Sequence, residues 1–222
     1  MYSNTPQTQQ GIGMTSARTR RRLVEQIRGL GINNIELLNI IESLPRHIFV
    51  DEALATRAYE NTALPIGHGQ TISQPYTVAL MTQTLFDRPR AKILEIGTGC
   101  GYQTAILSAL CEQVVSIERI QALHRKARDR CYDLGCRNIV FRHGDGFAGL
   151  ESYAPYDGIL AAAVSQDVPE ELIAQLAPNG RLIMPVGSGE QQVLTVIDRK
   201  GTSIHKQKLE AVRFVPRLAG LS

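Results

Sequence analysis

The sequence predicts a doubly wound α/β fold, in which a mostly parallel sheet of about seven strands carries helices on both faces. Three observations predict it. Strand-like and helix-like segments alternate from residue 91 onward, a glycine-rich turn joins the first strand to its helix, and the next strand ends in an acid, Glu118. The last two strand-like runs are separated only by residues 199–201, so an antiparallel C-terminal hairpin is expected.

The region before the sheet is expected to be a helical annex of the same domain. Residues 1–14 are mostly polar and are expected to form a disordered tail, which leaves a single domain over 15–222. Apolar periodicity predicts helices over 16–30, 34–44 and 76–85, and a short helical piece capped by Asp51. Residues 61–75 combine glycine and proline with hydroxyls and carboxamides, so we expect an irregular binding loop there.

The segments after residue 91 are expected to build the sheet and its covering helices. Strands are expected over 92–96, 114–118, 138–143, 156–162, 181–186, 193–198 and 203–214. Helices are expected over 104–110, 121–134 and 169–176. The domain therefore divides into an annex with a binding loop, 15–90, and a sheet region, 91–222.

Composition narrows the class of protein. The 222 residues are 43% apolar, enough for a full core, and the net charge of +3 comes from well-mixed acids and bases. Charge balance favours neither nucleic acid nor a membrane, and no apolar run approaches the roughly 20 residues of a membrane span. The arginines at 18 and 20–22 are either a nucleic-acid contact or, as we favour, the solvated face of a helix. No leader is recognised, so a cytoplasmic protein without nucleic-acid or membrane partners is expected.

The cysteines do not suggest a metal centre. They show neither a paired spacing nor a histidine spacing suited to zinc, and they are too few for a disulfide scaffold in a chain of this length. Free thiols and no metal site are expected for all of them: Cys100, Cys111, Cys131 and Cys136.

The glycine-rich turn favours a cationic cofactor over a dinucleotide. Glycines stand at alternate positions, 97, 99 and 101, but the third glycine of a dinucleotide fingerprint would fall at Tyr102. No lysine follows as in a P-loop, and the charge of Glu95, inside the strand before the turn, would repel phosphates. Glu118 is placed to accept hydrogen bonds from both hydroxyls of a ribose. S-adenosylmethionine, which has a ribose and a sulfonium but no phosphate, fits these observations.

These residues resemble the motifs of class I S-adenosylmethionine-dependent methyltransferases, which have a Rossmann-like fold. Residues 94–102 are similar to the first motif, Ile117 and Glu118 to the acidic end of the second strand, and 144–146 to the acidic loop after the third. The resemblance implies these cofactor-binding residues: Glu95, Gly97, Thr98, Gly99, Gly101, Tyr102, Glu118, Arg119, Gly144, Asp145 and Gly146. Taken singly, Glu118 could instead be a helix-cap partner and Asp145 a turn residue.

A narrower resemblance covers about residues 20–217. Segments 63–75, 45–50, 156–157, 182–187 and 212–216 are very similar to signatures of protein-L-isoaspartate O-methyltransferases. The resemblance implies a repair enzyme, expected to act as a monomer, that methylates the free α-carboxylate of isoaspartyl residues in damaged proteins. It further implies that Ser73 binds and orients that carboxylate as the catalytic residue, with these substrate-binding residues beside it: Thr71, Gln74, Arg213 and Val215.

Several alternatives remain open. Ser73 could simply cap the helix that follows, and His68 is the only nearby candidate base, although an ionised acceptor has no proton to remove. Three departures from the family's pattern are the segment 161–167, Arg217 and the first 15 or so residues. The competing functions are a methyltransferase for a small molecule or RNA, and a cofactor-binding module that has lost catalysis.

Overall fold

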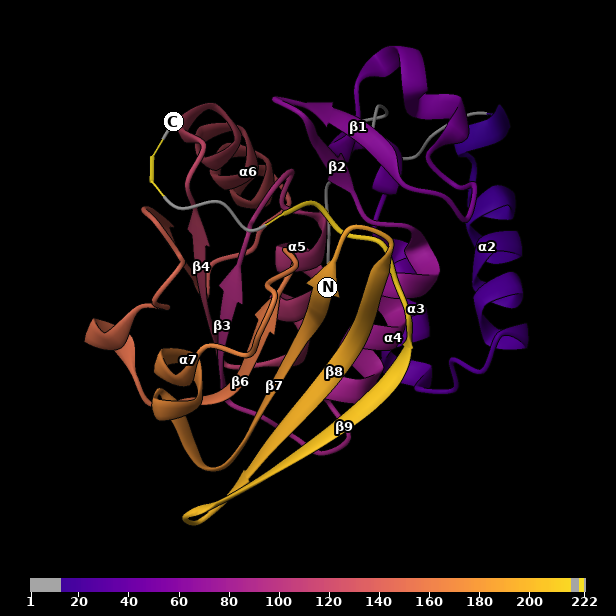
Figure 1. Ribbon diagram of the computed structural model, residues 1–222. Helices are drawn as coiled ribbons and strands as arrows, with labels where there is room; N and C mark the ends of the chain where they lie inside the picture. Colours follow the sequence, from indigo (N-terminus) through magenta and orange to yellow (C-terminus); the bar gives the residue numbers. More distant parts are fainter. Residues whose placement is uncertain (1–12, 217–219, 222) are drawn as a thin grey trace.

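A seven-stranded sheet forms the centre of the molecule, as Figure 1 shows for a computed structural model that describes residues 13–216, 220 and 221. The strands lie in the order β5-β4-β3-β6-β7-β8-β9. The first five are mutually parallel: β5 (Ile139–His143), β4 (Gln113–Glu118), β3 (Lys92–Ile96), β6 (Tyr156–Ala161) and β7 (Leu176–Ser188). The expected doubly wound α/β class is thereby confirmed.

The C-terminal strands run antiparallel, as expected, but over a longer stretch. β8 (Gln191–Lys200) pairs antiparallel with β9 (Ser203–Ala211), which confirms the hairpin. β8 is also antiparallel to β7, a pairing that the sequence analysis did not anticipate. Together β8 and β9 form a long ribbon that projects beyond the lower edge of the sheet in Figure 1.

Helices cover both faces of the sheet unequally. The helices α4 (Pro75–Leu85), α5 (Tyr102–Leu110) and α6 (Gln121–Asp133) belong to one layer, while the short α7 (Glu170–Ala174) packs on the opposite face. The strands β3 and β4 are buried on both sides, which is why they read as continuous apolar runs instead of alternating.

The N-terminal annex packs against the α4 and α5 layer. After the 3-10 turn η1 (Gly13–Thr15) come α2 (Ala17–Gly29), α3 (Ile35–Ser43) and the 3-10 turns η2 (Arg46–Phe49) and η3 (Glu52–Arg57). The side chains of Asn34 and Asp51 cap α3 and η3. Leu30, the last residue of the helix expected over 16–30, follows the end of α2 and is 50% exposed. Residues 1–12 of the expected tail, and Arg217, lie outside the described residues.

The expectation of an irregular stretch over 61–75 is wrong. Residues in it form a small antiparallel hairpin, β1 (Leu64–Gly67) with β2 (Gln70–Ile72). The turn places His68 at φ 55° between two glycines that also have positive φ. Leu64 and Ile72, which pair across the hairpin, are both buried in the core of the annex. This anchoring fixes the residues that follow β2.

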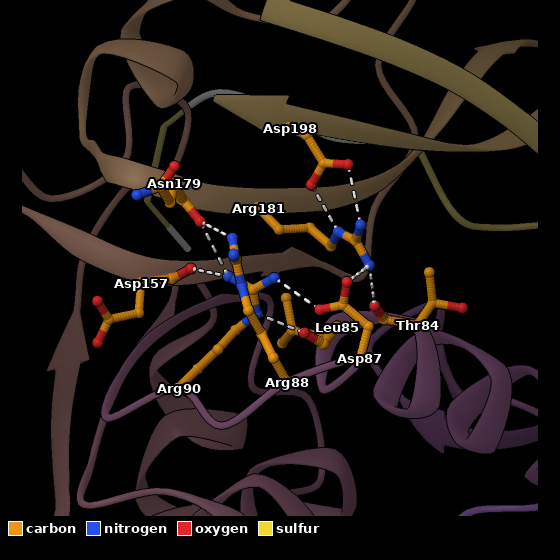
Figure 2. A network of polar contacts seen from close by, with 9 residues as sticks. All are labelled: Thr84, Leu85, Asp87, Arg88, Arg90, Asp157, Asn179, Arg181 and Asp198. Atoms are coloured by element: carbon orange, nitrogen blue, oxygen red, sulfur yellow. Dashed lines mark hydrogen bonds and ion pairs between the residues drawn. The ribbon is translucent and has the colours of Figure 1, made fainter. Parts of the chain in front are cut away.

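The buried Arg90 and the half-buried Arg181 fasten the C-terminal end of α4 to the sheet, as Figure 2 shows. Arg90 donates hydrogen bonds to the carbonyl oxygens of Leu85 and Asp157. Arg181 binds both carboxylate oxygens of Asp198, at 2.7 and 2.9 Å, and these bonds lower the pKa of Asp198. Because α4 is held at this end, the position of its other end, next to the hairpin, is also defined.

Among the residues that the structure describes, no helix has both the length and the apolar character to cross a membrane.

Candidate functional site

A cavity lies at the carboxyl ends of β3, β4 and β6, where ligands of doubly wound sheets bind. Its floor is the glycine turn after β3, and one wall comes from the end of β4 and the loop after β5. The opposite wall comes from β2, the start of α4 and the closing segment after β9. Segments far apart in the sequence therefore meet around one space.

Glu118 holds the glycine turn in place through hydrogen bonds to backbone N–H groups. Its two carboxylate oxygens accept the backbone N–H groups of Gly99, at 2.8 Å, and of Ile120, at 2.9 Å. Gly99 has φ +55°, a backbone conformation that favours glycine. Each carboxylate oxygen keeps a further lone pair, so Glu118 can still accept hydroxyl donors from a ligand.

Glu95 lies beneath the cavity and not in its lining. The side chain is fully buried, and its Oε2 accepts hydrogen bonds from Thr104 (2.5 Å) and Ser116 (2.6 Å). Since the Ser116 hydroxyl donates to Glu95, the Thr98 hydroxyl, 2.6 Å away and part of the cavity wall, donates to Ser116. Burial raises the pKa of Glu95 to about 8. The negative charge that the sequence argument relied on is therefore largely neutralised at pH 7.

Asp145 accepts hydrogen bonds from its own loop and from a residue near the C-terminal end of the chain. Its carboxylate accepts the N–H of Phe147 at 2.8 Å and the N–H of Gly220 at 2.7 Å. Arg119 in turn donates to the carbonyl oxygen of Gly220 at 2.9 Å. A backbone amide thus already donates to Asp145, so its expected role in cofactor binding stays a prediction.

Ser73 faces the cavity from the wall formed by the annex. Its carbonyl oxygen is bound by Arg46, while its hydroxyl has no hydrogen-bond partner among the described residues. Ser73 does not cap α4: the N-cap position is Gln74, and the first-turn N–H of Tyr76 is bound by Asn61 instead. The hydroxyl is therefore available to a ligand.

The closing segment after β9 completes this wall. The side-chain amide of Gln192, in β8, accepts the N–H of Phe214 at 2.6 Å and donates to its carbonyl oxygen at 3.2 Å. The carbonyl oxygen of Val215 accepts the N–H of Val164 at 3.0 Å. These bonds place Val215 and Pro216 at the cavity and join them to the segment after β6.

The structure brings most of the expected site residues together. Those that line the cavity are Thr71, Ser73, Gly97, Thr98, Gly99, Tyr102, Glu118, Arg119, Asp145, Gly146 and Val215. Five others do not line it: Gln74, Glu95, Gly101, Gly144 and Arg213. The sequence analysis did not assign the following lining residues to the site: Gln70, Ile72, Val78, Ile96, Cys100, Gln103, Ile117, Ile120, Phe147, Ala162, Ala163 and Pro216.

Almost no feature of the sequence indicated that these additional residues would line a cavity. Ile96 and Ile117 end buried strands and look like ordinary core residues until the strand ends are known to border a cavity. The unusual segment 161–167 did point to this place, since Ala162 and Ala163 form part of the wall. Their methyl side chains leave the cavity open there.

The arrangement suits an uncharged sugar and a cationic group better than a metal or a polyphosphate. An acid borders the glycine floor at Glu118, and a carboxylate repels phosphate at short range. Among the described residues, no three histidine, cysteine or acidic side chains are grouped as metal ligands would be. On the opposite wall, Thr71 and Ser73 offer neutral hydroxyls that can orient an anion.

Comparison with known proteins gives concordant matches. The family model described as protein-L-isoaspartate(D-aspartate) O-methyltransferase matches residues 18–221. A protein-L-isoaspartate O-methyltransferase of Alcanivorax borkumensis is 54% identical, over 95% of this chain and 96% of its own. A protein-L-isoaspartate O-methyltransferase of Pseudomonas paraeruginosa is 55% identical, over 93% of this chain and 99% of its own. A Plasmodium falciparum structure, provisionally named as the same enzyme and solved with S-adenosyl-L-homocysteine, is 27% identical, with a TM-score of 0.78 over 90% of this chain and 98% of its own.

Proposed function

Because this chain belongs to the protein-L-isoaspartate(D-aspartate) O-methyltransferase family, we propose that it transfers a methyl group from S-adenosylmethionine to the free α-carboxylate of L-isoaspartyl residues in damaged proteins. The neighbouring backbone nitrogen then attacks the carbonyl carbon of the resulting methyl ester, which expels methanol and closes a succinimide, and this begins the repair. We expect the enzyme to act as a monomer in the cytoplasm, without a nucleic-acid or membrane partner.

One observation supports the proposal above all: two chemically different walls face each other across one cavity. The glycine floor and Glu118 form a surface for a ribose and a cation, while Ser73 and Thr71 form a surface for an anion. An intervening space between a cation site and an anion site is what transfer to a carboxylate requires, because donor and acceptor must be held in line at close range.

The proposed residues act by orientation and not by proton transfer. A carboxylate with a pKa near 4 is already ionised at pH 7, so the acceptor requires no general base. S-adenosylmethionine supplies, when bound, the methyl group on an electrophilic sulfonium. The hydroxyl of Ser73 can donate one hydrogen bond to the acceptor, which orients the attacking oxygen without neutralising it. His68, at the exposed hairpin turn, has no place in this scheme.

A pair of peptides tests the function. The enzyme is incubated with radiolabelled S-adenosylmethionine and either an isoaspartyl peptide or its normal aspartyl twin. Label transferred only to the isoaspartyl peptide is the expected result. Label on neither peptide, with S-adenosylhomocysteine binding intact, would support a binding module or another acceptor instead, such as a small molecule or RNA.

Replacing Ser73 with alanine is expected to raise KM for the isoaspartyl peptide about tenfold, because a hydrogen bond to a charged group is lost. Affinity for S-adenosylhomocysteine should stay within about twofold, since the hydroxyl faces the acceptor side. Steady-state kinetics and calorimetry measure the two quantities. Ser43→Ala, an exposed hydroxyl in α3, is the matched control. Unchanged peptide kinetics in Ser73→Ala would contradict the assigned role.

A further inference from the structure

Arg46 is a fully buried cation beside the cavity, and no step of the proposed reaction uses it. It lies in η2 and reaches three separate segments. Its Nε donates to the carbonyl oxygen of Ala58 at 2.9 Å, and its Nη2 donates to that of Ser73 at 2.7 Å. Its guanidinium carbon lies 4.7 Å from the ring centroid of Tyr102. Arg46 therefore joins two cavity residues that belong to opposite sides of the site, Ser73 and Tyr102.

No carboxylate of the described residues is a counterion to Arg46. Its Nη1 is buried and has no hydrogen-bond partner among those residues. Desolvation lowers the pKa of Arg46, but a guanidinium stays protonated in proteins. A buried charge of this kind costs several kcal/mol unless something compensates it. The two carbonyl oxygens and the Tyr102 ring compensate part of this cost, and an anionic acceptor held at Ser73 would compensate more.

We propose that Arg46 is a positioning residue that selects a carboxylate as the methyl acceptor. The inference rests on the proposed function. Arg46 donates to the Ser73 carbonyl oxygen, which polarises the peptide group between Ser73 and Gln74 and holds the backbone from which the Ser73 side chain extends. Its charge adds a positive potential at a wall whose described lining residues offer only neutral donors.

The position of Arg46, outside the cavity lining, should determine how strongly it affects KM and kcat. Arg46 does not line the cavity, so it does not contact the acceptor directly. A direct ion pair would stabilise the carboxylate more than the transition state, in which the acceptor's charge is being lost, and would slow the transfer. A cation that acts through the Ser73 carbonyl improves binding of the acceptor but stabilises its carboxylate less than a direct ion pair would, so it slows the transfer less. Loss of Arg46 should thus raise KM for the peptide more than it lowers kcat.

Two variants separate the effect of the Arg46 charge from the effect of the hydrogen-bonding geometry of its guanidinium group. Arg46→Met removes the charge at similar volume, and Arg46→Lys keeps the charge but cannot donate to Ala58 and Ser73 in the same way. The matched controls are Arg90→Met and Arg90→Lys, because Arg90 is also buried and also donates to carbonyl oxygens (Figure 2), but near the amino ends of β3 and β6, whereas the cavity lies at their carboxyl ends. Thermal unfolding of all four variants reports any general loss of stability.

The decisive measurement is discrimination between charged and neutral acceptors. Binding of an isoaspartyl peptide and of its isoasparaginyl twin, whose α-carboxylate is an amide, is measured by calorimetry with the enzyme saturated with S-adenosylhomocysteine. We expect Arg46→Met to reduce the affinity ratio of the two peptides about tenfold, and Arg46→Lys to keep that ratio while raising KM about fivefold. Both Arg90 controls should retain the wild-type ratio. Affinity for S-adenosylhomocysteine should not change in any variant by more than about twofold.

The possible failures are distinguishable. If the wild-type enzyme methylates the isoaspartyl peptide and Arg46→Met keeps the full affinity ratio, the role of Arg46 is wrong and the proposed function stands. If Arg46→Met does not fold, an unchanged peptide KM in Arg46→Lys overturns the role in the same way. If the wild-type enzyme shows no preference for the isoaspartyl peptide over its aspartyl and isoasparaginyl twins, both proposals fail together.

Discussion

Replacing Glu118 with glutamine is expected to weaken binding of S-adenosylhomocysteine about 100-fold, the largest effect on binding among the changes considered. The wild-type carboxylate accepts two backbone N–H groups at once, from Gly99 and Ile120. A glutamine amide has only one oxygen, so its NH2 group must face one of these donors. The substitution therefore disturbs the glycine turn and also removes the charge available to ribose hydroxyls.

The effect should be confined to the cofactor side of the cavity. KM for the isoaspartyl peptide, measured at saturating S-adenosylmethionine, is expected to stay within about threefold of the wild type because Ser73 is on the opposite wall. Glu112→Gln is the matched control: the same chemical change on an exposed residue just before β4. If a folded Glu118→Gln protein bound S-adenosylhomocysteine as tightly as the control does, Glu118 would be a structural residue of the turn only.

Features set by neighbouring residues could be predicted from the sequence. The strand before the glycine turn, the acid at the end of the next strand and the C-terminal hairpin all depend on local periodicity and short connections. Their relative placement then follows from the rule that parallel strands of a doubly wound sheet end at one edge. This is why Gly99, Glu118 and Asp145, which lie at or just after the carboxyl ends of three different strands, line one cavity.

Features set by distant contacts could not be predicted in the same way. The hairpin of β1 and β2 was missed because its anchors, Leu64 and Ile72, are recognisable only once the annex core is known. The contact of Asp145 with Gly220 joins residues that are 75 positions apart. Residue pattern also shows that Glu95 interrupts an apolar strand, but not whether that acid keeps its charge, which depends on the surroundings in three dimensions.

The charge state of Glu95 leads to the second large effect, on stability. Its pKa is raised from 4.5 in the unfolded chain to about 8 in the folded protein, mainly by burial. Between these values the folded protein holds a proton that the unfolded chain has lost, so stability falls as pH rises through this window and levels off above about pH 8. Over the full window the loss is on the order of 5 kcal/mol, at about 1.4 kcal/mol for each pKa unit.

Glu95→Gln should remove this dependence, since glutamine has the shape of the protonated acid and does not titrate. In urea unfolding at pH 5, 6.5 and 8, the free energy of unfolding of the variant minus that of the wild type is expected to increase steadily. Glu112→Gln, on the exposed residue, should show a constant difference. A constant difference for Glu95→Gln as well would mean that the carboxyl is ionised in the folded protein at neutral pH. The hydrogen bonds from Ser116 and Thr104 would then outweigh the cost of burying its charge.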